Sequence, residues 1–238
     1  MRVQHVIKVT GVAGAERHLL TLIPGLRARG VDTRLLALVE PENPVEALRI
    51  EAEKAGIPFD RMVIRGNADL SLIGKLRAYF KQTPPEIVHT HLLHADLYGI
   101  PAARLAGVPR VITSRHNDDD FRRKTQWRMI HRAQWRMLDA GIGISDAITR
   151  FCLEVEGAPP DKMTTIRYGI NAAPLDVAQK AANRAAVRAE LGFSADTPII
   201  GMVGRLIPQK GFAYGIEAFA ALIPQKGFAY GIEAFAAL

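Results

Sequence analysis

The sequence predicts an α/β fold built on a doubly wound, mostly parallel sheet, followed by a C-terminal helical extension. Short β-branched runs with alternating polarity, typical of strands, recur along the chain and alternate with amphipathic segments typical of helices. The first strand, helix and second strand occupy about thirty-five residues, which is the size of one βαβ unit. Because a crossover through a helix joins parallel strands, this alternation predicts a parallel sheet.

The strands are predicted from apolar runs that end in turn residues or polar side chains. They are expected at residues 3–9, 33–39, 61–64, 86–91, 111–114, 141–144 and 163–166. The helices are predicted from amphipathic segments, several of which are followed by glycine. They are expected at residues 15–29, 45–55, 70–82, 94–106, 121–138, 147–156 and 178–191. Pro24 should kink or end the first helix, and Ser145 should cap the helix at 147–156.

The composition fits one large globular domain, or one and a half ordinary ones. The chain has 238 residues, of which 48% are hydrophobic, so it can bury a sizeable core. Its single cysteine, Cys152, excludes an internal disulfide and is typical of a reducing compartment. The sequence has neither an apolar run of about eighteen residues nor an N-terminal signal, so we expect a cytoplasmic protein without a membrane span.

Two glycines, Gly11 and Gly14, follow the first predicted strand and precede a helix that begins Ala-Glu-Arg-His. Glycine lets the backbone approach a ligand closely, and a helix N-terminus presents unpaired N–H groups to an anion. The loop, together with Glu16, therefore indicates a pocket for an anion or a sugar. It is not the dinucleotide fingerprint, because the third glycine of G-x-G-x-x-G is absent.

Histidines stand at the ends of two predicted strands. His89 and His91 end the strand at 86–91, and His116 and Asn117 follow the strand at 111–114. In doubly wound sheets, ligands bind beyond the C-terminal ends of the strands. A metal site is one interpretation, but side chains alternate along a strand, so we expect at most one of His89 and His91 to face a given pocket. We therefore expect no metal, and assign these histidines to polar contacts with a sugar or to capping of the strand ends.

A second glycine-bearing turn, at residues 201–211, follows the apolar run at 199–200 and precedes an amphipathic segment. This order predicts a strand, a turn and a helix. The turn contains Arg205, Lys210 and Gly211; a guanidinium is a forked donor and an ammonium a point charge, and both suit phosphate oxygens. The alternative is an ordinary turn with solvated charges.

Residues 207–222 recur without a change as residues 223–238. A tandem copy this short and this exact does not fit a diverged solenoid, so it indicates either a recent natural duplication or an engineered one. Each copy carries an apolar stripe typical of a helix. Because Pro224 disfavours helical geometry at the residue before it, we predict two helices with a break at 222–224. The stripes are expected to pack on each other, on the preceding domain or on a second chain.

The net charge is +7, and most of the excess lies on the helix predicted at 121–138. This segment has no acid and carries six basic residues, Arg122, Arg123, Lys124, Arg128, Arg132 and Arg136. A solvated basic face is one interpretation. The other is contact with an anionic membrane surface on the inner face, or with a phosphorylated acceptor. No helix-turn-helix, zinc or RNA-recognition motif accompanies the charge, so we expect no nucleic-acid partner.

Six motifs, in order along most of the chain, resemble those of GT4-type retaining glycosyltransferases of the two-domain GT-B fold. They lie at residues 11–16, 87–91, 106–116, 143–148, 168–171 and 204–211. In that family a Rossmann-like N-terminal domain binds the acceptor, a C-terminal domain binds the sugar nucleotide, and no metal is essential. The resemblance implies a UDP- or GDP-linked sugar as donor substrate, a glycan or lipid-linked acceptor, and no further cofactor.

The resemblance also implies roles for particular residues. His116 would face the transferred sugar as the catalytic residue. The donor phosphates would be contacted by Gly11, Gly14, Arg205, Lys210 and Gly211. The acceptor side would include Glu16, His89, His91 and Asn117.

By the same resemblance, residues 1–171 would form the acceptor-side domain, 172–196 a linker with one helix, and 197–238 the first strand and helix of a donor-binding domain. Two features depart from the family. The usual Asn-Gly-Ile-Asp is Tyr-Gly-Ile-Asn at 168–171, and the acidic motif of the donor domain has no counterpart. We therefore expect this chain alone to transfer no sugar. The alternatives are a non-catalytic sugar- or phosphate-binding module and a basic protein that binds membrane surfaces.

Overall fold

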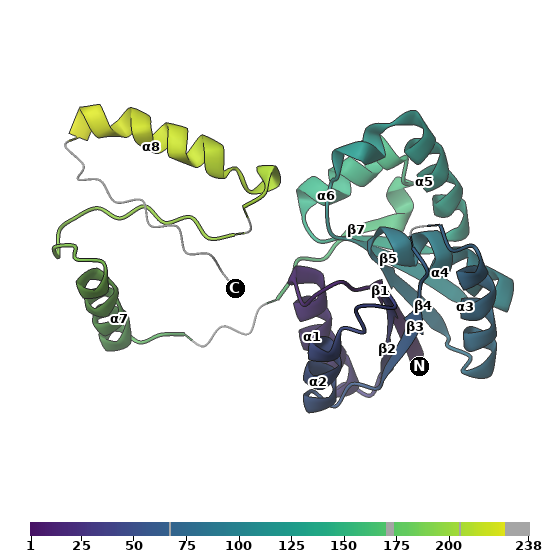
Figure 1. Ribbon diagram of the computed structural model, residues 1–238. Helices are drawn as coiled ribbons and strands as arrows, with labels where there is room; N and C mark the ends of the chain where they lie inside the picture. Colours follow the sequence, from purple (N-terminus) through teal and green to yellow (C-terminus); the bar gives the residue numbers. More distant parts are fainter. Residues whose placement is uncertain (67, 170–173, 205, 227–238) are drawn as a thin grey trace. The chain divides into compact units, whose positions relative to one another are not determined.

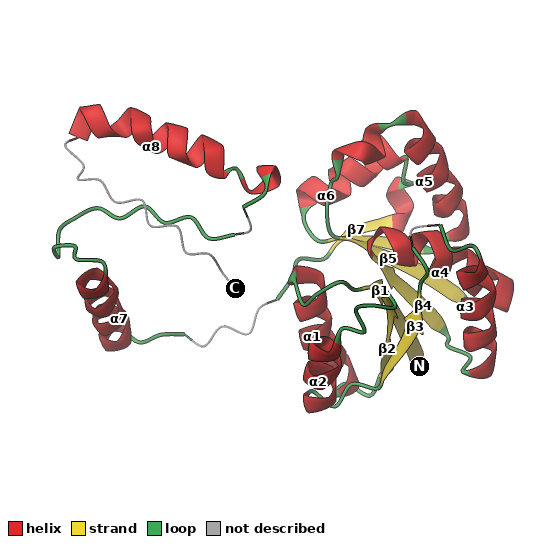
Figure 2. Cartoon of the chain, in the orientation of Figure 1, coloured by secondary structure: helices red, strands yellow, loops and turns green. Residues whose placement is uncertain are grey.

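The computed structural model describes residues 1–66, 68–169, 174–204 and 206–226. The chain forms two compact units, residues 1–171 and residues 172–238, and each is described by itself. The first unit is a sheet flanked by helices, and the described part of the second consists of helices joined by loops (Figures 1 and 2).

The first unit is built on one seven-stranded parallel sheet with the strand order β3-β2-β1-β4-β5-β6-β7. Its strands are β1 (Arg2–Lys8), β2 (Asp32–Val39), β3 (Phe59–Val63), β4 (Ile87–His91), β5 (Arg110–Arg115), β6 (Ala140–Gly143) and β7 (Met163–Thr165). The chain proceeds from β1 to β3 in one direction, returns to β4 beside β1, and then proceeds to β7 in the other. The predicted doubly wound parallel sheet is confirmed.

Helices connect the strands of this unit. They are α1 (Gly14–Arg27), α2 (Glu46–Lys54), α3 (Ser71–Gln82), α4 (Leu92–Ala106), α5 (Thr125–Met137) and α6 (Asp146–Phe151), with a π-helical turn (Cys152–Glu156) after α6. Pro24 does not end α1, because it lies in the last turn, where only one backbone hydrogen bond is lost. In the described part of the chain, no helix is both long and apolar enough to cross a membrane.

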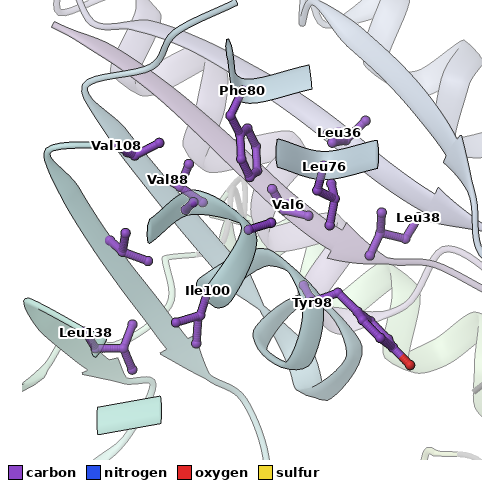
Figure 3. Packing of buried hydrophobic residues seen from close by; sticks show 14 of the residues in the cluster. Val6, Leu36, Leu38, Leu76, Phe80, Val88, Tyr98, Ile100, Val108 and Leu138 are labelled. Carbon is purple, nitrogen blue, oxygen red and sulfur yellow. The ribbon is translucent and has the colours of Figure 1, made fainter. Parts of the chain in front are cut away.

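The sheet separates two apolar cores. On one face, strands β1, β2 and β4 pack against α3 and α4 through Val6, Leu36, Val88, Leu76, Phe80, Tyr98 and Ile100 (Figure 3). On the other face, β1 and β2 pack against α1 through Ile7, Leu35, Ala37, Leu19 and Ile23. Burying one such large side chain contributes about 1.5–3 kcal/mol. The two cores therefore fix β1 and β4, which lie at the centre of the sheet.

The second unit contains α7 (Val177–Glu190), a 3₁₀ turn (Pro208–Lys210) and α8 (Phe212–Lys226). The strand predicted at the apolar run 199–200 is wrong, because residues 198–203 are coil. A strand forms by pairing with another strand, and residues 174–204 and 206–226 contain none. No side chain described in these two ranges is buried, so the described part of this unit has no core of its own.

α8 runs without interruption through Pro224, so the break predicted at residues 222–224 is wrong. A proline removes one backbone hydrogen bond, and a helix already formed over residues 212–222 propagates past that loss. The second copy from residue 227 onward lies outside the described residues. The packing of the two copies on each other and the self-association of the chain therefore stay predictions.

Candidate active site

The candidate site lies where the strand order reverses, between β1 and β4. In doubly wound sheets, ligands bind beyond the C-terminal strand ends at this point. His91 ends β4, His116 follows β5, and α1 begins at Gly14 after β1. Because all the strands are parallel, these three predicted residues are brought to the same edge of the sheet.

Three imidazole rings, those of His5, His89 and His91, form what we call the histidine cluster. The register of β1 and β4 pairs His5 with His89. The ring centroids of His89 and His91 lie 4.2 Å apart, and those of His5 and His89 lie 4.9 Å apart. The prediction that only one of His89 and His91 faces a given pocket is wrong, because residues two apart on a strand point to the same face. His5 was not predicted as a site residue.

A chain of side-chain hydrogen bonds runs from this cluster to the edge of the sheet. Nδ1 of His5 lies 2.9 Å from Nε2 of His91. Nδ1 of His91 lies 3.1 Å from Nε2 of His116. The chain ends at Tyr168, whose hydroxyl is hydrogen-bonded to Nδ1 of His116. Both ring nitrogens of His91 and of His116 therefore have partners.

These imidazoles are neutral at pH 7. Burial, with the nearby His18 as a smaller cause, lowers the pKa of His5 to about 3 and that of His116 to about 3. Burial likewise holds the pKa values of His89 and His91 well below the ordinary value. A neutral imidazole has one donor and one acceptor nitrogen, which is the state that a hydrogen-bonded chain requires.

Among the described residues, the histidine cluster is the group that could hold a metal ion, since one nitrogen from each ring lies within 4.8 Å of the others. In the structure, however, His5 and His91 bond to each other, and Nε2 of His89 lies 2.8 Å from Oγ of Ser114. We interpret the cluster as a hydrogen-bond network, and the expected absence of a metal stays a prediction.

Tyr168 and His18 close this network at its outer end. Their rings stack with centroids 3.8 Å apart, Tyr168 coming from the loop after β7 and His18 from α1. Burial, and next the charge of Glu16, raise the pKa of Tyr168, so its phenol stays protonated. Neither residue was predicted to belong to the site. The one indication in the sequence was the departure of residues 168–171 from the family motif.

The glycine loop before α1 places Gly11 and Gly14 where a side chain would meet open space. Neither has a positive φ, so neither packing nor backbone geometry requires glycine at these positions. Glu16 is buried, and its Oε2 accepts a 3.0 Å hydrogen bond from the N–H of Ala13. Glu16 therefore fixes the start of α1, and its contact with an acceptor stays a prediction.

A second network, the buried charge cluster of Asp96, Arg115, Arg122 and Glu156, lies on the opposite face of β5. Glu156 accepts hydrogen bonds from Arg115 at 3.0 Å and from Arg122 at 2.7 Å, and Arg115 also pairs with Asp96. Arg122 donates to Oδ1 of Asn117 at 3.1 Å, which holds that predicted site residue in place. Arg122 is 1% exposed, so its predicted place on the solvent-facing basic surface is wrong: its charge is compensated inside the protein.

The predicted phosphate contacts of the later turn belong to the second unit, whereas the other predicted site residues belong to the first. Arg205 lies outside the described residues. Lys210 is exposed and ends the 3₁₀ turn, and Gly211 has a φ of 68°, a conformation that favours glycine. The backbone conformation at residue 211 therefore favours glycine at the point where the chain enters α8.

A parallel sheet of this order, with a glycine loop before its first helix and polar side chains at the strand ends, defines a doubly wound, Rossmann-like α/β protein with its candidate site at the point where the strand order reverses. The chain belongs to Glycosyltransferase Family 4, whose family model matches residues 12–173.

The chain is 29% identical over 164 residues to alpha-maltose-1-phosphate synthase from Mycolicibacterium smegmatis, covering 64% of this chain. It is 29% identical over 158 residues to UDP-Gal:alpha-D-GlcNAc-diphosphoundecaprenol alpha-1,3-galactosyltransferase from Escherichia coli, covering 63% of this chain. Each match covers 40% of the relative, so the chain spans less than half the length of these curated relatives.

Solved structures show the same fold. Anabaena HepE in complex with UDP matches with a TM-score of 0.70 at 18% identity, covering 94% of this chain and 59% of that one. A glycosyltransferase from Rickettsia africae matches with a TM-score of 0.68 at 16% identity, covering 96% of this chain and 58% of that one. These likenesses, together with the family match, confirm the predicted GT4-type GT-B relationship.

Proposed function

We propose that the protein is a retaining glycosyltransferase that transfers a sugar from a nucleotide sugar to an acceptor. The position of His116 carries the proposal. It follows β5 at the C-terminal edge of the sheet, is hydrogen-bonded to Tyr168 and His91, and lies within the residues that the family model matches. A neutral imidazole at this edge can hydrogen-bond a hydroxyl of the transferred sugar.

The proposed donor is a UDP- or GDP-linked sugar. UDP is favoured, because HepE binds UDP and UDP-glucose and the Escherichia coli relative is named for UDP-Gal. Arg205, Lys210 and Gly211 would hold the diphosphate. The open space at Gly11 and Gly14 would let the donor phosphates or the acceptor approach the N-terminus of α1.

The proposed acceptor is a glycan or lipid-linked sugar. Glu16 and Asn117 would shape the acceptor side through the loops that they fix. His89 and His91 are 5% and 0% exposed, so neither would touch the acceptor. His91 would hold His116 through their hydrogen bond, and His89 would pack beside His91.

We also propose that this 238-residue chain alone transfers little or no sugar. The described part of its second unit has neither a strand nor a buried side chain, so it offers no rigid surface on which Lys210 and a nucleotide base could be held together. On its own the chain would act as a sugar- or phosphate-binding module.

Titration of the isotope-labelled chain with UDP-glucose, UDP-galactose and GDP-mannose, followed by NMR, tests the proposed function. We expect at least one of them to shift the resonances of His116, Tyr168 and the loop at 11–14. His116→Ala should abolish the shifts of Tyr168 and of the loop. Arg49→Ala, which removes an exposed ion pair on α2, is the control and should bind as the native chain does. The absence of any shift would refute the proposal, and equal shifts with inorganic phosphate alone would favour the non-catalytic module.

A second contact, with an anionic membrane surface, is proposed for α5. Met129 is 65% exposed, on the side of the helix that also presents Arg132 and Arg136, whereas Trp135 is buried. An apolar side chain flanked by cations suits a surface of anionic lipid. The cytoplasmic and peripheral location expected from the sequence is part of this proposal.

Sedimentation with phosphatidylglycerol vesicles tests this contact. The chain should sediment at low salt and be released at high salt, because exposed charges are screened. Arg132→Glu with Arg136→Glu should abolish sedimentation, while Arg49→Glu on α2 should not. Equal sedimentation with vesicles of neutral phosphatidylcholine would contradict the contact.

A further inference from the structure

Both ring nitrogens of His116 are engaged in the structure. Nε2 lies 3.1 Å from Nδ1 of His91, and Nδ1 is hydrogen-bonded to the hydroxyl of Tyr168. A neutral imidazole has only one donor and one acceptor position. A sugar hydroxyl can therefore bond to a ring nitrogen of His116 only by displacing one of these two partners.

The two partners differ in how readily they can be displaced. His91 is 0% exposed and is itself bonded to His5, which is 1% exposed, so losing His91 would leave buried nitrogens without partners. Tyr168 is partly exposed and lies in the loop after β7. A phenol hydroxyl and a sugar hydroxyl can each donate or accept, so one can replace the other at Nδ1. A sugar hydroxyl is therefore expected to displace Tyr168, rather than His91, from His116.

The chain of hydrogen bonds also couples the tautomers of its three rings. If Tyr168 donates to Nδ1 of His116, then Nε2 of His116 donates to His91, and Nε2 of His91 donates to His5. If Tyr168 accepts, every bond reverses and each ring carries its proton on Nδ1. Any mixed arrangement would bring two donors or two acceptors together in a buried contact, at the cost of a lost hydrogen bond.

On the basis of the proposed function, we propose that Tyr168 is a positioning residue for His116. Its hydroxyl holds Nδ1 until a hydroxyl of the sugar takes its place, while His5 and His91 fix the tautomer in which His116 meets that sugar. The competing interpretation is a metal ion in the histidine cluster, which would have to displace a hydrogen-bond partner of His91, because both ring nitrogens of His91 are engaged.

Long-range proton–nitrogen correlation spectra of the chain with labelled histidines report the tautomer of each ring. At neutral pH we expect His5, His91 and His116 to carry their proton on the same ring nitrogen. Tyr168→Phe keeps the aromatic ring stacked on His18 and removes the hydroxyl, so it should shift the nitrogen resonances of His116. A residue that only supports the fold would not select one tautomer in three rings.

Tyr79→Phe is the matched control. It also removes a partly buried phenol hydroxyl, which lies 2.6 Å from Oδ2 of Asp60 and 3.2 Å from Oε1 of Gln4, away from His116. This variant should leave the resonances of His116 unchanged. Adding zinc chloride should likewise leave the spectrum of the native chain unchanged.

A titration with UDP-glucose completes the test. Tyr168→Phe should bind it roughly two- to tenfold more tightly than the native chain, because the sugar hydroxyl no longer has to displace the phenol. If UDP-glucose and other sugar nucleotides bind neither form, the proposed function fails, whereas the ligand-free spectra still decide how His116 is held.

Three results would overturn the proposal. The first is a set of different tautomers among the three rings, and the second is unchanged His116 resonances in Tyr168→Phe. The third is a shift of the nitrogens of His5, His89 and His91 on addition of one equivalent of zinc, which would identify a metal site.

Discussion

Lowering the pH from 7 to 5 is expected to destabilise the first unit by several kcal/mol, although most carboxylates titrate below this range. Burial lowers the pKa of folded His5 to about 3, whereas in the unfolded chain it has its ordinary value of 6.5. The unfolded state therefore binds the extra proton, so this stability is fully present above pH 6.5 and is lost as the pH falls toward 3. His5 alone should lose about 2 kcal/mol between pH 7 and pH 5. His89, His91 and His116 act in the same direction.

Urea denaturation of the whole chain at several pH values, followed by tryptophan fluorescence, measures this loss. Both tryptophans, Trp127 and Trp135, lie in α5, so the fluorescence reports on the first unit. His116→Asn removes one titrating ring and should flatten the pH dependence, whereas Glu46→Gln in an exposed ion pair should not. A free energy of unfolding that is the same at pH 7 and pH 5 would show that the imidazoles are solvated.

The strands and helices of the first unit could be predicted from the sequence, because their determinants are local. Alternating β-branched runs marked the strands, and the predicted cap Ser145 does accept a hydrogen bond from the N–H of Ile148 at 3.2 Å. The strand predicted at residues 199–200 failed for the converse reason: a strand depends on a partner that no local pattern supplies.

The geometry of the site could not be predicted, because it depends on contacts between distant residues. His5 and His91 are 86 residues apart and meet only because β1 pairs with β4. Tyr168 reaches His116 across 52 residues. Composition showed that Arg122 is charged but not that it is buried against Glu156. The residue types at the strand ends were therefore predictable, and their partners were not.

Replacing Glu156 by glutamine is expected to destabilise the first unit by about 3–5 kcal/mol, the usual effect of removing one partner from a buried ion pair. Glu156 is 0% exposed and accepts hydrogen bonds from Arg115 at 3.0 Å and Arg122 at 2.7 Å. Burial opposes its ionisation, but Arg115, His131 and Arg122 together hold the pKa of Glu156 below its ordinary value. Glutamine would leave Arg115 paired with Asp96, and Arg122 with only the partly exposed Asp119 at 3.9 Å.

Glu154→Gln is the matched control, because Glu154 lies in the same π-helical turn but is exposed. Its effect should stay within about 0.5 kcal/mol. Adding Arg122→Met to Glu156→Gln restores the charge balance of the buried cluster, since one cation then faces one anion. The double variant should therefore be more stable than Glu156→Gln alone, a coupling that additive effects would not produce. If urea denaturation instead shows Glu156→Gln to be as stable as Glu154→Gln, the buried charge cluster does not contribute to the stability of the first unit.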